Sequence, residues 1–328
     1  MSRYAAFGRG THNESPEKVL DVMNCRHYSS VYILLNSIKT SLRLFLAASI
    51  LAAFSPSAQS ADDQTPVDMT GFDLFHPTPS QYLREMTTDG TRATQSPYTV
   101  DAGHFQVEMT LFGYSSYEDN SGGVTYKLKT WNIGPINLKV GLFDRLDLQL
   151  ILEPYNHIYE TEVGYSQVTR NGYGDTTLRL KFNCWGNDSG STALALMPYA
   201  RFATSRNGVG NDHFEGGVIV PFSAELPWDF YLGLTGSIAL TQSNSEQNYH
   251  KEYTGSISLS RKLFGDLEGY VECFNGVTTE KGIGRATTFN LGLIYWLSDN
   301  VQLDAGVDLG MTTWADDWYA FVGTSWRF

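Results

Sequence analysis

The sequence predicts an all-β protein: a 12-stranded antiparallel transmembrane β-barrel of the outer-membrane type, preceded by a signal peptide and an irregular lead-in. Three features support this fold. Apolar and polar residues alternate over long stretches, short and long connections alternate along the chain, and the chain ends on Trp326-Arg327-Phe328. An alternation with a period of two gives a strand one apolar face and one polar face. In a closed membrane barrel the apolar face meets lipid and the polar face lines the interior.

Residues 1–60 are expected to be an N-terminal extension plus a signal peptide. Lys39 and Arg43 precede an apolar run at 44–54, and Ala58-Gln59-Ser60 provides a small-residue cleavage site before Ala61. The run is too short to cross a bilayer as a helix, which takes roughly 20 residues. The stretch before it is long for a signal peptide, so the sequence leaves open whether translation starts at Met1 or Met23.

Charge narrows the possible partners. Six of the 23 basic and three of the 35 acidic residues lie in 1–60, so the remainder carries 17 basic and 32 acidic residues, a net charge of −15. This balance argues against a nucleic acid, whose phosphates attract basic surfaces. It suits the hydrated acidic loops of an envelope protein. No cofactor is expected.

Cys184 and Cys273 are the cysteines that follow the signal peptide. Both fall on the apolar face of their strands, far apart in the predicted strand order. We expect them to act as small hydrophobic residues, although an oxidising compartment would allow a disulfide.

Residues 61–102 are predicted to be a periplasmic lead-in or a partial plug. They are rich in Thr, Pro, Asp and Ser and have no sustained period. The pattern changes at Gly103, so the barrel is expected to occupy 103–328. Twelve strand-like segments follow, at 103–117, 124–142, 145–156, 173–185, 191–204, 213–224, 229–242, 251–262, 267–276, 286–297, 300–313 and 318–328.

The connections between these segments alternate in length. Short ones contain pairs such as Phe143-Asp144 and Gly265-Asp266, and the longer ones run about 118–123, 157–172, 205–212, 243–250, 277–285 and 314–317. Outer-membrane barrels have short periplasmic turns and long external loops. An even number of strands also returns the C-terminus to the side on which the barrel begins.

The apolar face can be followed within single strands. Leu178, Leu180 and Phe182 alternate with Arg179 and Lys181. A soluble β-sandwich would show the same alternation with its apolar face turned inward. The membrane barrel is favoured because charges occur in the middle of the polar faces and because closure removes the sheet edges that an exported protein must protect.

The segment TTDGTRATQSPYTVDAGHFQVE, residues 87–108, opens the predicted barrel. It resembles the start of the outer-membrane transporter family labelled "MetA-pathway of phenol degradation". That family has a Thr-Asp-Arg-Pro-like stretch, then Ser-Pro-Tyr-Thr-Val and a first strand ending in Glu. Gly90-Thr91 replace the Arg-Pro pair here. The similarity covers about 80–328 and implies a bacterial outer-membrane barrel with a channel role. It brings no catalytic residues, and we carry no phenolic substrate over from the label.

Charges on the polar faces are sorted around the predicted ring. The expected pore-lining basic residues are Lys127, Lys129, Lys139, Arg145, Arg179, Lys181 and Arg201, and the acidic ones are Glu108, Glu268, Glu272, Asp304 and Asp308. Because the fourth strand lies opposite the tenth, a basic arc would face an acidic arc across the interior. Such a transverse field sets ion selectivity. Asp147 and Glu153 interrupt the basic arc, and a small barrel filled with paired charges is the alternative.

Catalytic and metal sites are not indicated. The chain has no Gly-x-Ser-x-Gly elbow, and no histidine precedes a Ser-Asn-Gly-like stretch. His157, His213 and His250 lie at or beside long loops with acidic residues nearby, but solvated loop histidines explain this better than a metal centre. A rim-located esterase or lipase is therefore an unlikely alternative, and we expect that the protein is not an enzyme.

The sequence as a whole indicates an outer-membrane channel or transporter for passive uptake of small solutes through a charged lumen. A non-conducting barrel that acts as an anchor or adhesin through its acidic external loops is the main alternative. The expected partners are outer-membrane lipid, small solutes, and the barrel-assembly machinery through the C-terminal Phe328. The solute, the oligomeric state, and whether 61–102 enters the lumen are not specified by the sequence.

Overall fold

The closed wall of the molecule is an antiparallel sheet whose first strand pairs with its last. The computed structural model describes residues 68–328, apart from 90–92, 121–122, 212 and 243–247. The predicted signal peptide and the choice between Met1 and Met23 lie outside these residues. In the described part, fifteen strand segments run in the order β15-β14-β13-β12-β11-β10-β9-β8-β7-β4-β3-β1-β2-β5-β6, and β15 also pairs with β1.

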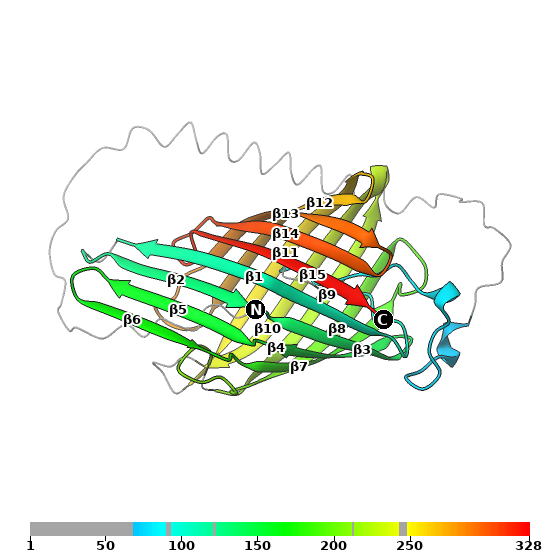
Figure 1. Cartoon of the computed structure of the whole chain (residues 1–328), viewed down its shortest axis with the longest axis horizontal. Helices are drawn as coiled ribbons and strands as arrows, with labels where there is room; N and C mark the ends of the chain where they lie inside the picture. The colour runs from blue at the N-terminus through cyan, green and yellow to red at the C-terminus, as the bar shows by residue number, and fades with distance from the viewer. Residues whose placement is uncertain (1–67, 90–92, 121–122, 212, 243–247) are drawn as a thin grey trace. The chain divides into compact units, whose positions relative to one another are not determined.

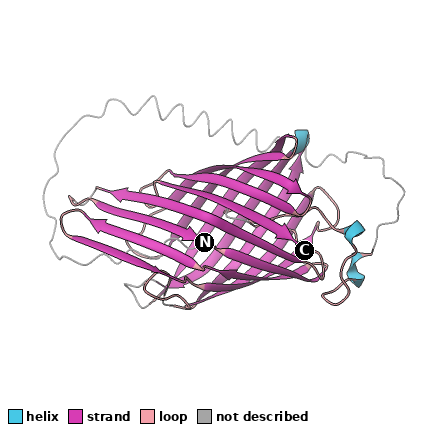
Figure 2. Cartoon of the chain, in the orientation of Figure 1, coloured by secondary structure: helices cyan, strands magenta, loops and turns pink. Residues whose placement is uncertain are grey.

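The strand segments lie side by side and form the wall, and Figure 1 labels them. Their bounds are β1 (Phe105–Asp119), β2 (Tyr126–Ile133), β3 (Ile136–Phe143), β4 (Leu146–Leu152), β5 (Tyr155–Glu162), β6 (Ser166–Gly172), β7 (Thr176–Trp185), β8 (Thr192–Phe202), β9 (Glu215–Leu226), β10 (Phe230–Gln242), β11 (Tyr249–Phe264), β12 (Leu267–Thr278), β13 (Ala286–Ser298), β14 (Val301–Gly310) and β15 (Trp318–Arg327). Three short 3-10 helices are η1 (Met69–Gly71), η2 (Ser80–Tyr82) and η3 (Pro227–Asp229). Figure 2 shows how completely strands dominate.

Three pairs of segments are halves of single long strands. β2 and β3 are separated by Gly134-Pro135, β4 and β5 by Glu153-Pro154, and β6 and β7 by residues 173–175. Proline cannot donate a backbone hydrogen bond to a neighbouring strand, so it interrupts the ladder. Counting each pair once turns the fifteen segments into twelve strands around the ring. The predicted 12-stranded barrel is confirmed.

One predicted external loop is wrong in form. Residues 157–172 were expected to be a long connection, but they form most of the β5–β6 hairpin, with the tip at 163–165. β5 also pairs with β2, so β2, β5 and β6 continue the wall at the loop end of the barrel (Figure 1). The edge of β6 that does not pair with β5 contacts the β8–β9 connection. There Asn207 Nδ2 donates to the Asn171 carbonyl at 3.0 Å.

The two faces of the wall differ sharply in burial. On β7, Leu180 is 40% exposed and Phe182 50%, whereas Arg179 is 5% exposed and Lys181 is fully buried. Apolar side chains therefore point outward and charged side chains point into the barrel. This inverts the arrangement of a soluble sandwich and matches a wall bathed in lipid. None of the helices in the described residues is long and apolar enough to cross a membrane.

The chain approaches the barrel at the end that carries the short turns. The backbone N–H of Leu74 donates to the Leu142 carbonyl at 3.0 Å, and that of Thr78 donates to the Ala102 carbonyl at 3.0 Å. The ring of His104 lies 2.9 Å from the Phe328 carbonyl and 2.8 Å from the Thr78 carbonyl. These contacts fix the lead-in beside both ends of the barrel sheet.

Candidate functional site

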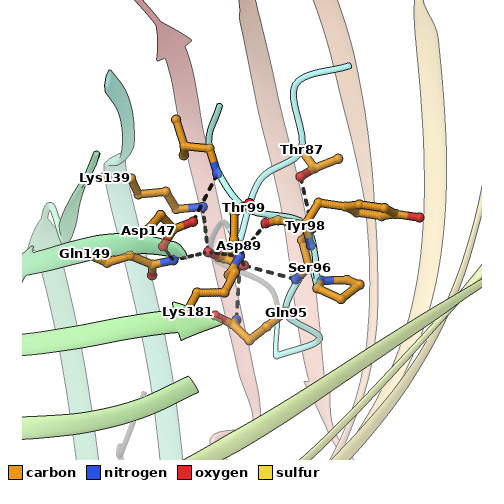
Figure 3. A network of polar contacts seen from close by, with 12 residues as sticks. Thr87, Asp89, Gln95, Ser96, Tyr98, Thr99, Lys139, Asp147, Gln149 and Lys181 are labelled. Atoms are coloured by element: carbon orange, nitrogen blue, oxygen red, sulfur yellow. Dashed lines mark hydrogen bonds and ion pairs between the residues drawn. The ribbon is translucent and has the colours of Figure 1, made fainter. Parts of the chain in front are cut away.

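Residues 87–89 and 93–100, called here the inner segment, lie inside the barrel and contact the wall on several sides. Its polar groups reach β3, β4 and β7 in one direction and β10, β11 and β12 in the other. Figure 3 shows the part of this network around Asp89. No regular secondary structure forms in its described residues, so its backbone groups are available to side chains of the wall.

Asp89 is the centre of the network on the basic side. Its carboxylate lies 2.5 Å from Nζ of Lys139 and 2.8 Å from Nζ of Lys181. Lys139 also lies 2.5 Å from the Glu108 carboxylate, and the backbone N–H of Asp89 donates to that carboxylate at 3.2 Å. All four side chains are buried. Burial opposes the charged form of Asp89, but the two ammonium groups outweigh it and hold the pKa of Asp89 below its ordinary value of 3.8.

Neighbouring side chains complete the contact between the inner segment and this side of the wall. Gln149 Nε2 donates to Asp89 at 3.1 Å and to Asp147 at 3.0 Å. The other oxygen of Asp147 accepts from the backbone N–H of Val100 at 3.1 Å. Arg179 donates to the Gln95 side chain at 2.8 Å. Because a buried charge is tolerated only when it is paired and hydrogen-bonded, these contacts explain how the barrel holds charges in its interior.

The opposite side of the wall holds the inner segment through its backbone. Glu272 accepts hydrogen bonds from the backbone N–H groups of Ala93 at 3.2 Å and Thr94 at 2.7 Å. Its carboxylate also accepts from Asn290 at 2.7 Å. The Thr94 hydroxyl donates to Ser256 at 2.8 Å. The inner segment thus links an acidic residue of β12 to the lysines of β3 and β7.

A second anchor ties the start of the segment to the short-turn end. Arg84 lies 2.7 Å from Asp101, 3.2 Å from Asp144 and 3.1 Å from Asp188. Arg327, on the last strand, lies 3.2 Å from Asp101 and donates to the Arg84 carbonyl at 2.6 Å. Burial raises the pKa of Asp144 above its ordinary value, and the charge of Arg84 opposes that shift.

The structure places the predicted pore-lining residues in three groups. Those on the inner face are Lys139, Arg179, Lys181, Arg201, Glu108, Glu268, Glu272, Asp304 and Asp308. Lys139, Lys181, Arg179, Glu108 and Glu272 all contact the inner segment or its direct partners. Arg145 lies in the turn between β3 and β4, with its side chain 51% exposed.

Lys127 and Lys129 are corrected: both lie on the outer face. Paired residues of an antiparallel sheet share a face. β1 pairs Ser115 with Thr130 and Gln106 with Lys139. A bulge in β1 between Thr110 and Phe112 shifts its register, so Ser115 and Gln106 both point inward, and both are buried. In β2 the even-numbered residues therefore point inward, and in β3 the odd-numbered residues point inward. The alternation between inward and outward residues therefore shifts by one at Gly134-Pro135. The prediction from the sequence assumed one unbroken alternation from 124 to 142. Lys127 instead pairs with Glu118 on the outer face, 2.9 Å away.

Several residues of the site were not predicted at all. Arg84, Asp89, Gln95 and Asp101 belong to the stretch without periodicity, where no rule of alternation assigns a face. One signal was available: Lys139 and Lys181 are inward lysines in mid-strand, and a buried ammonium requires a carboxylate partner. Among the described residues, no group of three or more His, Cys, Asp or Glu side chains could hold a metal ion.

Neutralising Lys127 and Lys129 together to glutamine is expected to leave the ion selectivity of the reconstituted barrel unchanged. Both side chains face outward, and an exposed ion pair such as Lys127–Glu118 contributes about 0–1 kcal/mol to stability. Reversal potentials in a salt gradient measure this. Arg201→Gln is the matched inward control. A shift in the double variant as large as that of the control would contradict the outward assignment.

The comparisons with known proteins agree with this fold. A family model described as "Putative MetA-pathway of phenol degradation" matches residues 88–328. An outer membrane channel from Pseudomonas putida F1 is 11% identical, with a TM-score of 0.53 over 76% of this chain and 99% of that one. At this identity the likeness establishes the fold alone. A search of curated protein sequences gives no match.

Two other solved structures are similar at lower scores. The NanC porin is 8% identical, with a TM-score of 0.45 over 68% of this chain and 100% of that one. The translocator domain of the autotransporter NalP from Neisseria meningitidis is 11% identical, with a TM-score of 0.45 over 68% of this chain and 88% of that one. We draw nothing from these two.

The closed barrel with an apolar outer face and a charged interior belongs in the bacterial outer membrane.

Proposed function

Because this chain belongs to the family described as "Putative MetA-pathway of phenol degradation", a porin-like family of outer-membrane barrels, we propose that it is a channel for passive uptake of small solutes. The inner segment acts as a plug in the channel, and solutes pass when the plug shifts. The pore-lining residues of this channel are the inward charges named above. The substrate suggested by the family description is not part of the proposal.

The polar contact between plug and wall is the observation that carries this proposal. Asp89, Glu272, Gln95 and Arg179 hold the segment through hydrogen bonds and ion pairs. Each of these bonds involves a charged group and contributes about 1.5–3 kcal/mol net, and water can replace it when the segment leaves. A segment packed by large apolar side chains would instead expose apolar surface to water, which nothing replaces. The plug is therefore held in place yet can be released.

A non-conducting barrel is the second candidate, and the buried ion pairs around Asp89 favour it. Small barrels do fill their interior with paired charges. In that case the barrel would serve as an anchor or adhesin through its acidic loops. In either case we propose a non-enzymatic barrel, in line with the family to which this chain belongs.

Planar-bilayer recording on the purified, refolded chain separates the two candidates. The channel predicts discrete conductance steps that increase with salt concentration. Heat-modifiable gel mobility must first establish that the barrel has folded and inserted. Folded, inserted protein that gives no steps over a wide voltage range would reject the channel and leave the anchor.

Reversing Asp308 to lysine is expected to shift the ion selectivity toward anions. Asp308 pairs across the sheet with Asn290, a buried inward residue, so its carboxylate faces the interior. A charge at the wall of a narrow passage biases which ions pass through. Reversal potentials in a salt gradient measure the shift, with the outward Lys127→Gln variant as the control. Identical reversal potentials would exclude Asp308 from the conducting path.

A further inference from the structure

A second group of charged side chains lies inside the barrel, nearer the long connections than the inner segment. Thr94 of the segment reaches Ser256 on β11, and Glu252 precedes Ser256 by four residues toward the loop end. We call this group the loop-side cluster. Its members are Glu153, Asp175, Arg201, Asn211, Glu215 and Glu252.

Arg201 does not balance the carboxylates of the loop-side cluster. Its guanidinium lies 3.1 Å from Asp175, 3.4 Å from Glu215 and 4.0 Å from Glu153. Three carboxylates therefore surround one guanidinium, and Glu252 lies on the same inner face. The inward Arg179, which pairs with Tyr199, donates to Gln95 of the inner segment. The cluster therefore keeps an excess of negative charge on the path that a solute would follow.

Short side chains separate Glu252 from an aromatic ring. The strand pairing places Glu252 opposite Ala239, Ala239 opposite Gly217, and Gly217 opposite Tyr199. All four residues share the inner face. A Cβ atom on Gly217 would lie only 3.0 Å from a ring carbon of Tyr199, so that ring lies directly against the glycine. A carboxylate and an aromatic ring thus flank the same two small residues.

Asn211 provides an independent sign that the cluster takes a ligand. The side chain is 1% exposed, and its amide nitrogen donates to Glu215 at 2.5 Å. Within the described part of the chain, its Oδ1 has no hydrogen-bond partner, and neither has Nε of the neighbouring Arg201. A buried carbonyl oxygen without a donor is costly. Asn211 Oδ1 is an acceptor that lies among carboxylates. Electrostatics therefore favours a positively charged donor as its partner.

We propose that the loop-side cluster binds a small organic cation, an ammonium ion with N–H donors. Glu252 provides the carboxylate, Asn211 Oδ1 an additional acceptor, and the Tyr199 ring an aromatic surface for the cation. An organic ammonium fits better than a metal ion, because no three carboxylates or other metal-binding side chains of the described residues lie so that they could hold a metal ion. The inference deepens the proposed function and rests on it for the route by which the ligand reaches the site.

Saturation-transfer NMR with ethylammonium chloride tests the site on the refolded full chain. The wild-type protein is expected to transfer saturation to ethylammonium, and Glu252→Gln to bind it at least tenfold more weakly. Glu280→Gln, in the β12–β13 connection, is the matched control and is expected to bind like the wild type. No transfer to the wild type, or equal transfer to Glu252→Gln, would overturn the site.

A second comparison does not depend on the folding of the variant. Wild-type protein is expected to favour ethylammonium at least tenfold over 1-propanol, a neutral molecule of similar size. Equal binding of the two would also overturn the proposal. Binding without conductance would keep the site and reject the channel, whereas conductance without binding would reject the site and keep the channel.

Discussion

Replacing Asp89 with alanine is expected to release the inner segment and to raise the conductance of the barrel. The change leaves Lys139 and Lys181 buried without the carboxylate that both contact. Lys139 keeps Glu108, whereas Lys181 loses the carboxylate it contacts. Removing one partner of a buried ion pair typically costs about 3–5 kcal/mol, because the remaining charge is uncompensated. The lysines regain solvation if the segment leaves and water enters. The open interior should then pass more ions than the wild type.

Two measurements check this result. Single-channel recording should show a larger or longer-lived open state for Asp89→Ala, and amide hydrogen exchange in 93–100 should become faster. Asp68→Ala is the matched control, since Asp68 lies in the same lead-in and, among the described residues, hydrogen-bonds to the nearby Thr70. Asp89→Asn removes the charge and keeps the shape, so it should fall between the two. Equal conductance and exchange in Asp89→Ala and the control would mean that this ion pair does not hold the segment.

The same reasoning predicts how acid acts on the segment. The pKa of Asp89 is lowered in the folded protein, so the stability it contributes is fully present above its ordinary pKa of 3.8. That stability is lost as the pH falls below 3.8 toward the folded-state value. The segment should therefore stay in place at neutral pH. Over this part of the acid range, amide exchange in 93–100 should change less in the Asp89→Asn variant than in the wild type.

Locking the inner segment to the wall is expected to abolish conduction. Thr94 and Ser256 suit a disulfide, because their side-chain oxygens lie 2.8 Å apart and cysteine sulfurs would occupy similar positions. The double variant Thr94→Cys and Ser256→Cys should be made with Cys184 and Cys273 replaced by alanine, since these two cysteines are free. Oxidation then prevents the segment from moving out of the channel.

The recording compares the oxidised and reduced states of the same protein. Conductance steps should disappear on oxidation and return with a reductant. The single Thr94→Cys variant, which cannot form the bond, controls for the effect of oxidation itself. Undiminished conductance in the fully oxidised double variant would mean that ions pass beside a stationary segment, and the plug would have no gating role.

The sequence predicted the barrel well because a lipid-facing wall requires a strict alternation. Leu180 and Lys181 fall on opposite faces, as the period of two demands. The prediction failed where the period was interrupted. Gly134-Pro135 changes the phase between β2 and β3, so Lys127 and Lys129 were assigned to the wrong face. Residues 157–162 have many polar side chains on both faces, which is why the sequence predicts a loop there instead of the rest of a strand.

The contacts of the inner segment were much harder to predict. A coil without regular hydrogen bonds has no period, so neither Asp89 nor Gln95 could be assigned a direction from the sequence. The predicted basic and acidic arcs do exist in part on the inner face, in Lys139, Lys181 and Glu272. They meet the segment between them, because charges brought into a narrow interior require near partners. Only a three-dimensional arrangement reveals which residues provide those partners.

The link between Arg327 and the start of the segment has a consequence for biogenesis. Arg327 lies on the last strand to be synthesised, yet it contacts Asp101 and the Arg84 carbonyl, which precede the first strand. The same last strand joins β1 and closes the ring. A nascent chain that lacks its final residues therefore has neither a sealed ring nor this clamp. This clamp and the closure of the ring therefore form together, when β15 takes its place beside β1.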